Sequence, residues 1–294
     1  MPERQATGVE GASVAALDRL NIERLRRHLT TEVVGHHVYV FGTVDSTNRV
    51  LHSLADRGAR EGTVVLAERQ TAGRGRHGHA WFSPEAANLY ASVLFRPGLA
   101  LRELPTFAPI ASLALAEAVW CEGAPARIQW PNDVVVGGRK VGGVLVETAA
   151  AGDRVTHVIL GIGVNLNVER TTLEAALGGA AAGAGSLRES LGREIDRNIF
   201  AAALLNRLDK WQRTFVTRGP AAVLAAWQAR DVLRGRRLEV RTETEVWTGR
   251  GRGIDGDGSL LVEDDAGRTH RVLTGGVRLL ETEPQEVHSW PSAS

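Results

Sequence analysis

The spacing of hydrophobic residues changes several times along the first 230 positions, between short apolar runs typical of strands and longer stretches with helical spacing. The runs predict strands over residues 38–44, 63–68, 88–95, 127–130, 134–136, 141–146 and 155–166. The helical stretches cover residues 48–57, 110–119, 196–217 and 220–229, and a short amphipathic helix is expected around Leu17, Leu20, Leu25 and Leu29. This succession predicts an α+β fold in which a mixed β-sheet carries helices on one face.

The pattern shortens after Leu233. Five short strands at close spacing are predicted over residues 238–241, 245–254, 259–263, 268–273 and 277–280. The Asp- and Gly-rich segments 255–258 and 264–267 supply turns between them. We therefore expect a small C-terminal β-barrel that resembles an SH3 domain. The predicted organisation is an N-terminal extension with a short helix (1–35), a main domain (36–231), the barrel (232–282) and a tail (283–294).

Three local signals refine this picture. Asp45-Ser46-Thr47 is typical of a helix N-cap, and Ser46 could have that role alone. Gly137-Gly138 predicts a tight hairpin turn. The Gly/Ala stretch 178–185 predicts a flexible loop.

Composition excludes several classes of protein. Hydrophobic residues make up 43% and charged residues 23% of the chain, as in soluble globular proteins. No apolar run is long enough to predict a membrane span, and the first ten residues do not resemble a secretory signal. The single cysteine, Cys121, excludes an internal disulfide and any multi-cysteine metal site, which favours a cytoplasmic enzyme. A net charge of +1 gives no reason to expect a nucleic-acid partner.

Lysine is rare in this chain. Of the 35 basic residues only Lys140 and Lys210 are lysines, so either could be retained where a compact ammonium is needed. Lys210 lies in a helical stretch and is expected on a solvated face. Lys140 follows the Gly-rich hairpin turn and is the stronger candidate for chemistry, with a plain surface lysine as the alternative.

The segment Gly73-Arg74-Gly75-Arg76 suits the capture of an anion. Glycines let backbone N–H groups approach a phosphate or carboxylate, and arginines supply bidentate donors. The spacing matches neither a P-loop nor a dinucleotide fingerprint, so a solvated Arg/Gly loop is the alternative. Similarly, His77 and His79 could form a metal-binding pair but are more simply a solvated pair, and Trp130 could be a core aromatic.

Five segments in order give the chain a specific resemblance. They are Asp45-Ser46-Thr47-Asn48, Gln70 to Trp81, Trp130-Pro131-Asn132-Asp133, Gly138 to Glu147, and Gly161 to Asn167. Together they closely resemble the bacterial biotin–protein ligases, in the monofunctional form without a DNA-binding domain. The resemblance covers residues 38 to 281 and implies a class II synthetase-like (SH2-like) catalytic domain over residues 36–231, binding biotin and ATP.

The resemblance also implies an activity. Such ligases join biotin and ATP into biotinyl-5′-AMP and then transfer biotin to one lysine of the biotin carboxyl carrier protein of acetyl-CoA carboxylase. Matched by motif, the biotin-binding residues are Ser46, Thr47, Asn48, Gln70, Gly73, Arg74, Gly75, Arg76, Lys140, Gly142 and Gly143. The nucleotide-binding residues are Trp81, Asn132, Asn165 and Arg252.

The chemistry explains these residue types. Hydroxyl and amide groups suit a ureido ring, and the approach of a carboxylate to an α-phosphate requires cations, for which Arg76 and Lys140 are the catalytic candidates. Asp133 is a possible helper. Mg²⁺ on the ATP phosphates is implied, but no ligand cluster predicts a metal site on the protein. His77, His79 and Gln129 stand where basic residues are common in these ligases, and their effect on adenylate retention is left open.

Two alternatives remain to be weighed. A lipoate or octanoate ligase shares the catalytic fold but is disfavoured by the arginine loop and by Trp130-Pro131-Asn132-Asp133. A DNA-binding repressor would need a winged helix before residue 40, where there is no room for one. The expected partner is therefore the carrier protein, with no DNA and no membrane, and the chain could be a monomer or a homodimer.

Overall fold

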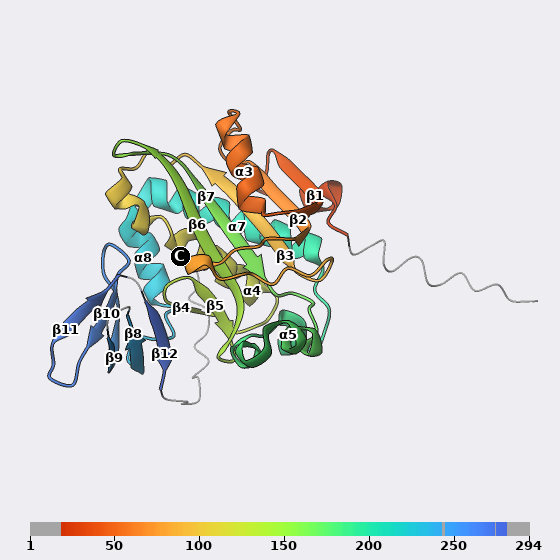
Figure 1. Cartoon of the computed structure of the whole chain (residues 1–294). Helices are drawn as coiled ribbons and strands as arrows, with labels where there is room; N and C mark the ends of the chain where they lie inside the picture. The colour runs from red at the N-terminus through yellow and green to blue at the C-terminus, as the bar shows by residue number, and fades with distance from the viewer. Residues whose placement is uncertain (1–18, 243–244, 274, 281–294) are drawn as a thin grey trace, which may run out of the picture.

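The computed structural model describes residues 19–242, 245–273 and 275–280. Its main element is a seven-stranded mixed sheet with the order β1-β2-β3-β7-β6-β5-β4 (Figure 1). The strands are β1 (Val38–Val44), β2 (Val64–Gln70), β3 (Leu89–Phe95), β4 (Arg127–Gln129), β5 (Asp133–Val136), β6 (Arg139–Ala151) and β7 (Arg154–Val164). β1 and β2 run parallel, and the other neighbours run antiparallel. The predicted strands and the α+β class are confirmed.

Helices cover both faces of this sheet, so the prediction of helices on one face was wrong. α4 (Pro109–Cys121) and α7 (Arg197–Arg218) pack against each other on one side, together with α8 (Pro220–Gln228). α3 (Thr47–Asp56) contacts β2, β3 and β7 on the other side. Side chains alternate along a strand, so Val64 and Leu66 join the large core while Val65 packs under α3 with Leu51. The helical pattern in the sequence shows an apolar stripe but not which face of the sheet it covers.

The remaining helices are short. They are α2 (Ile22–Arg26), α5 (Arg170–Leu177), α6 (Leu187–Leu191), and the 3-10 turns η1 (Arg76–Gly78), η2 (Leu101–Thr106) and η3 (Gly178–Gly183). α5 and α6 were not predicted, because each buries a single leucine and so has no repeated apolar spacing. The stretch 178–185 contains η3 rather than a simple flexible loop. Leu17 and the predicted tail 283–294 lie outside the described residues.

The C-terminal strands form a five-stranded antiparallel sheet with the order β11-β10-β9-β8-β12. They are β8 (Arg237–Arg241), β9 (Val246–Ile254), β10 (Leu260–Glu263), β11 (Thr269–Val272) and β12 (Gly276–Leu279), as predicted within one or two residues. The Trp130 indole donates to the Gly258 carbonyl at 3.0 Å, and the Gln228 amide donates to the Ile254 carbonyl at 2.7 Å. These contacts fix the C-terminal sheet against the main domain.

The segment Leu101–Cys121 is apolar and long enough to pass a test for a membrane span, but 67% of its most apolar window is buried in the fold. It comprises η2 and α4, and α4 is a core helix whose side chains from Pro109 to Val119 are buried. Its apolarity is explained by contacts with the sheet and α7.

Candidate active site

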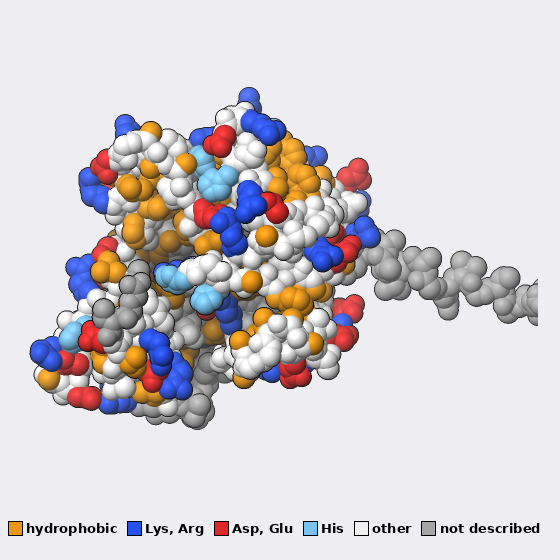
Figure 2. All heavy atoms as spheres, viewed as in Figure 1, with side chains coloured by type: hydrophobic (Ala, Val, Ile, Leu, Met, Phe, Trp, Pro, Cys, Tyr) orange, Lys and Arg blue, Asp and Glu red, His pale blue; other side chains and the backbone are white. Residues whose placement is uncertain are grey.

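A cavity of about 350 Å³ opens between the seven-stranded sheet, the loop that follows β2 and the start of β12. The face shown in Figure 2 is hollowed here, with histidine and basic side chains along the hollow. Neighbouring residues of β6 and β7 line it on one side. Most of the residues singled out from the sequence meet here: Ser46, Thr47, Asn48, Gln70, Arg74, Gly75, Arg76, Trp81, Asn132, Lys140 and Gly143.

One end of the cavity is polar and uncharged. The Gln70 side-chain carbonyl accepts from the Thr47 backbone N–H at 3.0 Å, and its amide donates to Ser83 at 3.1 Å. The Ser92 hydroxyl lies 2.8 Å from the Thr47 hydroxyl and 2.5 Å from Asn48 Oδ1. These contacts hold the side chains in fixed orientations before any ligand arrives.

Ser46 occupies the N-cap position of α3, but its side chain makes no capping hydrogen bond. It is buried and lines the cavity instead. The simple capping interpretation is therefore not what the structure shows, and Ser46 is available for a ligand.

Two glycines of β7 allow the side chains of other elements to approach the sheet. A Cβ at Gly161 would lie 2.3 Å from Asn48 Oδ1, and one at Gly163 would lie 2.4 Å from the Trp81 ring. Both distances are far shorter than van der Waals contact, so only glycine fits under these side chains.

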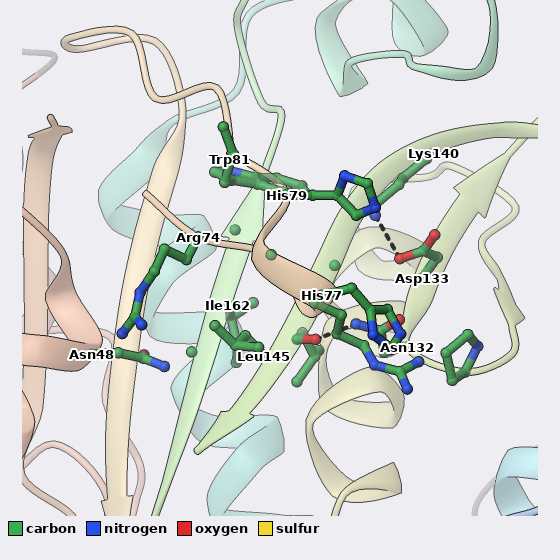
Figure 3. A pocket seen from close by; sticks show the side chains of 18 of the residues that line it. Asn48, Arg74, His77, His79, Trp81, Asn132, Asp133, Lys140, Leu145 and Ile162 are labelled. Carbon is green, nitrogen blue, oxygen red and sulfur yellow. Dashed lines mark hydrogen bonds and ion pairs between the residues drawn. The ribbon is translucent and has the colours of Figure 1, made fainter. Parts of the chain in front are cut away.

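The opposite end of the cavity is charged. Lys140 Nζ lies 2.6 Å from Asp133 Oδ1 and 5.3 Å from the centre of the Trp81 ring. Figure 3 shows Lys140 and Asp133 on one side and Arg74 with Asn48 on the other. Asp133 is the one acidic residue among the described residues that line the cavity.

The Arg76 guanidinium is a second cation here. Burial lowers its pKa, and the nearby Asp133 carboxylate acts in the opposite direction. No described residue accepts a hydrogen bond from this guanidinium. A half-buried cation without a partner is suited to an anionic ligand, because the ligand would restore the contacts that burial has removed.

The loop that carries Arg74 and Arg76 is closed by its own backbone. Trp81 N–H donates to the Gly73 carbonyl at 2.9 Å, and Gly75 N–H donates to the His79 carbonyl at 2.7 Å. His77, with a φ of 53°, allows the turn between them. His77 and His79 both line the cavity, and no group of three potential metal ligands is found among the described residues.

Two glycines that the resemblance assigned to biotin have a different place. A Cβ at Gly142 would lie 2.8 Å from Leu115 in α4, so this glycine faces the core and allows β6 to pack on that helix. A Cβ at Gly73 would lie 2.7 Å from the Ser83 hydroxyl and 2.9 Å from the Gln70 amide. Gly73 therefore supports the polar end from behind and does not line the cavity.

Two residues assigned to the nucleotide also lie away from the cavity. The Asn165 amide donates to the Gly185 carbonyl at 3.0 Å and connects β7 to the segment before α6. Arg252 pairs with Glu263 at 2.6 Å on the C-terminal sheet, and this hydrogen bond raises the pKa of Arg252. The C-terminal sheet reaches the cavity through residues 275–277 instead, and the spacing of the sequence gave no signal for that edge.

Lys210 is also not simply solvated. Its ammonium lies 3.1 Å from a carboxylate oxygen of the buried Glu117, to which Arg230 also contributes at 3.5 Å. This cluster is far from the cavity in the sequence and none of its members lines it. Of the two lysines, only Lys140 belongs to the candidate site.

Comparisons with known proteins agree with this geometry. The Biotin/lipoate A/B protein ligase family matches residues 40–165, and the Biotin protein ligase C terminal domain matches residues 235–278. The bifunctional ligase/repressor BirA of Bacillus subtilis is 34% identical over 250 residues, covering 85% of this chain and 76% of that protein. The biotin–[acetyl-CoA-carboxylase] ligase of Paracoccus denitrificans is 35% identical over 227 residues, covering 76% and 93%.

A similar fold is found among solved structures. The biotin protein ligase of Aquifex aeolicus in complex with biotin and ATP superposes with a TM-score of 0.68 at 27% identity, covering 84% of this chain and all (100%) of that one. The order of motifs, the shared fold and the matches over both domains agree, and the chain belongs to the biotin protein ligase family.

Proposed function

We propose that this protein is an ATP-dependent biotin–protein ligase that makes biotinyl-5′-AMP and transfers the biotinyl group to a carrier lysine. One observation carries the proposal: a single cavity joins an uncharged hydrogen-bonding end to a cationic end. Biotin has the same polarity, with a ureido ring at one end and a carboxylate at the other. The related ligases and the structure with biotin and ATP support the same activity.

In the first step the polar end would hold the ureido ring through Ser46, Thr47 and Asn48. Arg76 and Lys140 would lie around the biotin carboxylate and the α-phosphate of ATP. One carboxylate oxygen attacks the α-phosphorus, a P–O bond to pyrophosphate breaks, and biotinyl-5′-AMP and pyrophosphate result. The two cations lower the barrier because they offset the repulsion between two anions and the charge that develops on the phosphate.

In the second step the carrier supplies the nucleophile. The amine of its lysine attacks the carbonyl carbon of the mixed anhydride, an amide bond forms, and AMP leaves with the original bond to the phosphate oxygen. No nucleophile from this chain is required, because the anhydride is already activated. The partner we propose is the biotin carboxyl carrier protein of acetyl-CoA carboxylase, as the name of the Paracoccus relative suggests.

Mg²⁺ would enter with the nucleotide. It commonly binds proteins through one or two carboxylates together with substrate phosphates. Asp133 is the one described carboxylate at the cavity, and no cluster of three metal ligands occurs among the described residues. This donor set fits an ion carried mainly by phosphates, with Asp133 near its position.

The test is to incubate the protein with ATP, an unmodified carrier and either biotin or lipoate, and to follow the mass of the carrier. We expect a mass increase of one biotinyl group with biotin and none with lipoate. A lipoyl adduct formed faster than a biotinyl adduct would favour the lipoate-ligase alternative and contradict the proposal.

A further inference from the structure

Glu147 on β6 lies directly behind the polar end of the cavity but does not line it. Its carboxylate accepts two hydrogen bonds from residues that do line it. Oε2 accepts from the Asn48 amide at 2.7 Å, and Oε1 accepts from the Arg74 guanidinium at 2.9 Å. One side chain therefore connects α3 with the loop that follows β2.

The contact with Asn48 determines which group that amide can offer to a ligand. An asparagine amide has one carbonyl oxygen and two N–H donors. Asn48 Oδ1 is held by the Ser92 hydroxyl at 2.5 Å, and one Nδ2 donor is held by Glu147. What remains for the cavity is the second N–H donor, so Asn48 is oriented to bind an acceptor such as the ureido carbonyl.

The contact with Arg74 determines where the loop lies. Arg74 comes from a segment that is closed only by a few backbone hydrogen bonds, with its side chain about two-fifths exposed (42%). Glu147 ties this mobile cation to the sheet. The pairing is charge-assisted on both sides of the bond, which makes it stronger than a neutral hydrogen bond.

Other ionisable groups surround this carboxylate. His52 of α3 lies 3.8 Å from Glu147 Oε2, and its other ring nitrogen lies 3.1 Å from His157 of β7. Burial, with the nearby charges of His52 and Arg96, lowers the pKa of His157. A neutral His157 leaves Arg74 as the principal cation that Glu147 can pair with.

From this geometry, and resting on the biotin-ligase function above, we propose that Glu147 is a positioning residue for biotin recognition. It fixes the donor orientation of Asn48 and holds Arg74 across the cavity, so that both are in place when biotin enters. Glu147 itself touches neither the ligand nor the reacting atoms.

Glu147→Gln separates a positioning role from a structural one. A glutamine has the same shape, and its carbonyl can still accept from Asn48, but its amide group then faces Arg74 with a donor instead of an acceptor. It can satisfy one of the two contacts and not both. Glu147→Asp keeps the charge but is one methylene shorter, so it should restore part of the effect.

The expected kinetic result is selective. KM for biotin should rise about tenfold in Glu147→Gln, the size expected for a lost charge-assisted contact, and less in Glu147→Asp. KM for ATP, kcat for adenylate formation and Tm should stay close to wild type. Glu174→Gln is the matched control, because Glu174 also pairs with an arginine at 2.8 Å but on the surface of α5.

A second measurement needs no ligand. Trypsin cleaves after arginine, and without its partner Arg74 should be cut several times faster in Glu147→Gln than in wild type or Glu174→Gln, as read from the mass of the fragment that ends at Arg74. An unchanged rate at this bond would overturn the positioning role whichever acid the enzyme activates. A wild type that makes biotinyl-5′-AMP together with a Glu147→Gln variant of normal KM for biotin would overturn it too, and would leave the proposed function intact. Equal losses in both KM values, with a lower Tm, would reduce Glu147 to a structural residue.

Discussion

Removing the ammonium of Lys140 should slow adenylate formation strongly while leaving the fold intact. The ammonium lies 2.6 Å from Asp133 and above the Trp81 ring, at the charged end of the cavity. In Lys140→Ala the two reacting anions lose a cation, and the Asp133 carboxylate is left facing them. Both changes raise the barrier for attack on the α-phosphorus.

The size of the effect follows from the geometry. Losing one well-placed donor in a water-poor site costs about 3–4 kcal/mol, or roughly 10²–10³ in rate. The Lys140 side chain is 36% exposed, so screening by water places the expected loss near the lower end, about 10². Adding Asp133→Asn removes the uncompensated carboxylate and should recover about tenfold of this loss.

The assay is single-turnover formation of biotinyl-5′-AMP, followed by rapid quench. Arg139→Ala is the matched control, because Arg139 is the neighbouring residue of β6 and pairs with Glu189 outside the cavity. It should react at the wild-type rate. Lys140→Arg should fall between wild type and Lys140→Ala, since the planar guanidinium replaces a compact charge.

Thermal unfolding separates catalysis from stability. A half-exposed ion pair contributes about 0–1 kcal/mol, so the Tm of Lys140→Ala should be close to that of wild type. A wild-type rate in Lys140→Ala would remove this lysine from the mechanism. A recovery of rate in Lys140→Ala that requires no change at Asp133, as ionic strength is raised, would also contradict the reasoning.

Four further predictions follow from particular positions. Amide exchange across Gly73–Trp81 should slow when biotin is added, because ligand contacts must offset the entropy of ordering this loop; equal exchange with and without biotin would contradict this. Gly161→Ala should raise KM for biotin by tenfold or more in steady-state assays, because its Cβ would lie 2.3 Å from Asn48, and a normal KM would mean that the strand can move. Burial raises the pKa of Asp231 to about 6, so its contribution to folding becomes less favourable as the pH rises from about 4 to about 6, and Asp231→Asn should raise Tm at pH 8 but not at pH 4; equal shifts at both pH values would refute this. No sequence-specific operator DNA should be retained in a gel-shift assay with biotin and ATP, and ligand-dependent, salt-resistant retention would overturn that expectation.

Much of the fold could be predicted because the strands bury continuous apolar runs. β2 and β3 are buried along most of their length, and a run of that kind is visible in the sequence. α5 has one buried side chain, Leu173, and no local pattern distinguishes such a helix from a loop. Which face of the sheet α3 covers depends on contacts between distant segments, and the sequence does not show them.

The candidate site divides in the same way. Thr47, Gln70 and Lys140 could be identified because each lies in a short motif at a strand or helix end. Motif position alone also placed Gly142 and Arg252 at a ligand, whereas packing turns Gly142 toward α4 and an ion pair holds Arg252 on the C-terminal sheet. The residues behind the cavity belong to distant strands.

Ser92 and Glu147 illustrate this last point. Ser92 lies in an apolar strand, and Glu147 ends a conspicuous motif without any sign of its partners. Their hydrogen bonds to Asn48 span 44 and 99 positions of the chain. Only the folded sheet, which places β3 and β6 on either side of β7, brings them to the same amide.

The most direct test of the account is to mix the purified protein with biotin, ATP and Mg²⁺ and to measure the bound product by mass spectrometry. We expect biotinyl-5′-AMP and free pyrophosphate in equal amounts, with no adenylate when biotin is replaced by lipoate. Absence of biotinyl-5′-AMP under these conditions, with the protein folded and both substrates in excess, would contradict the assignment of this cavity to biotin activation.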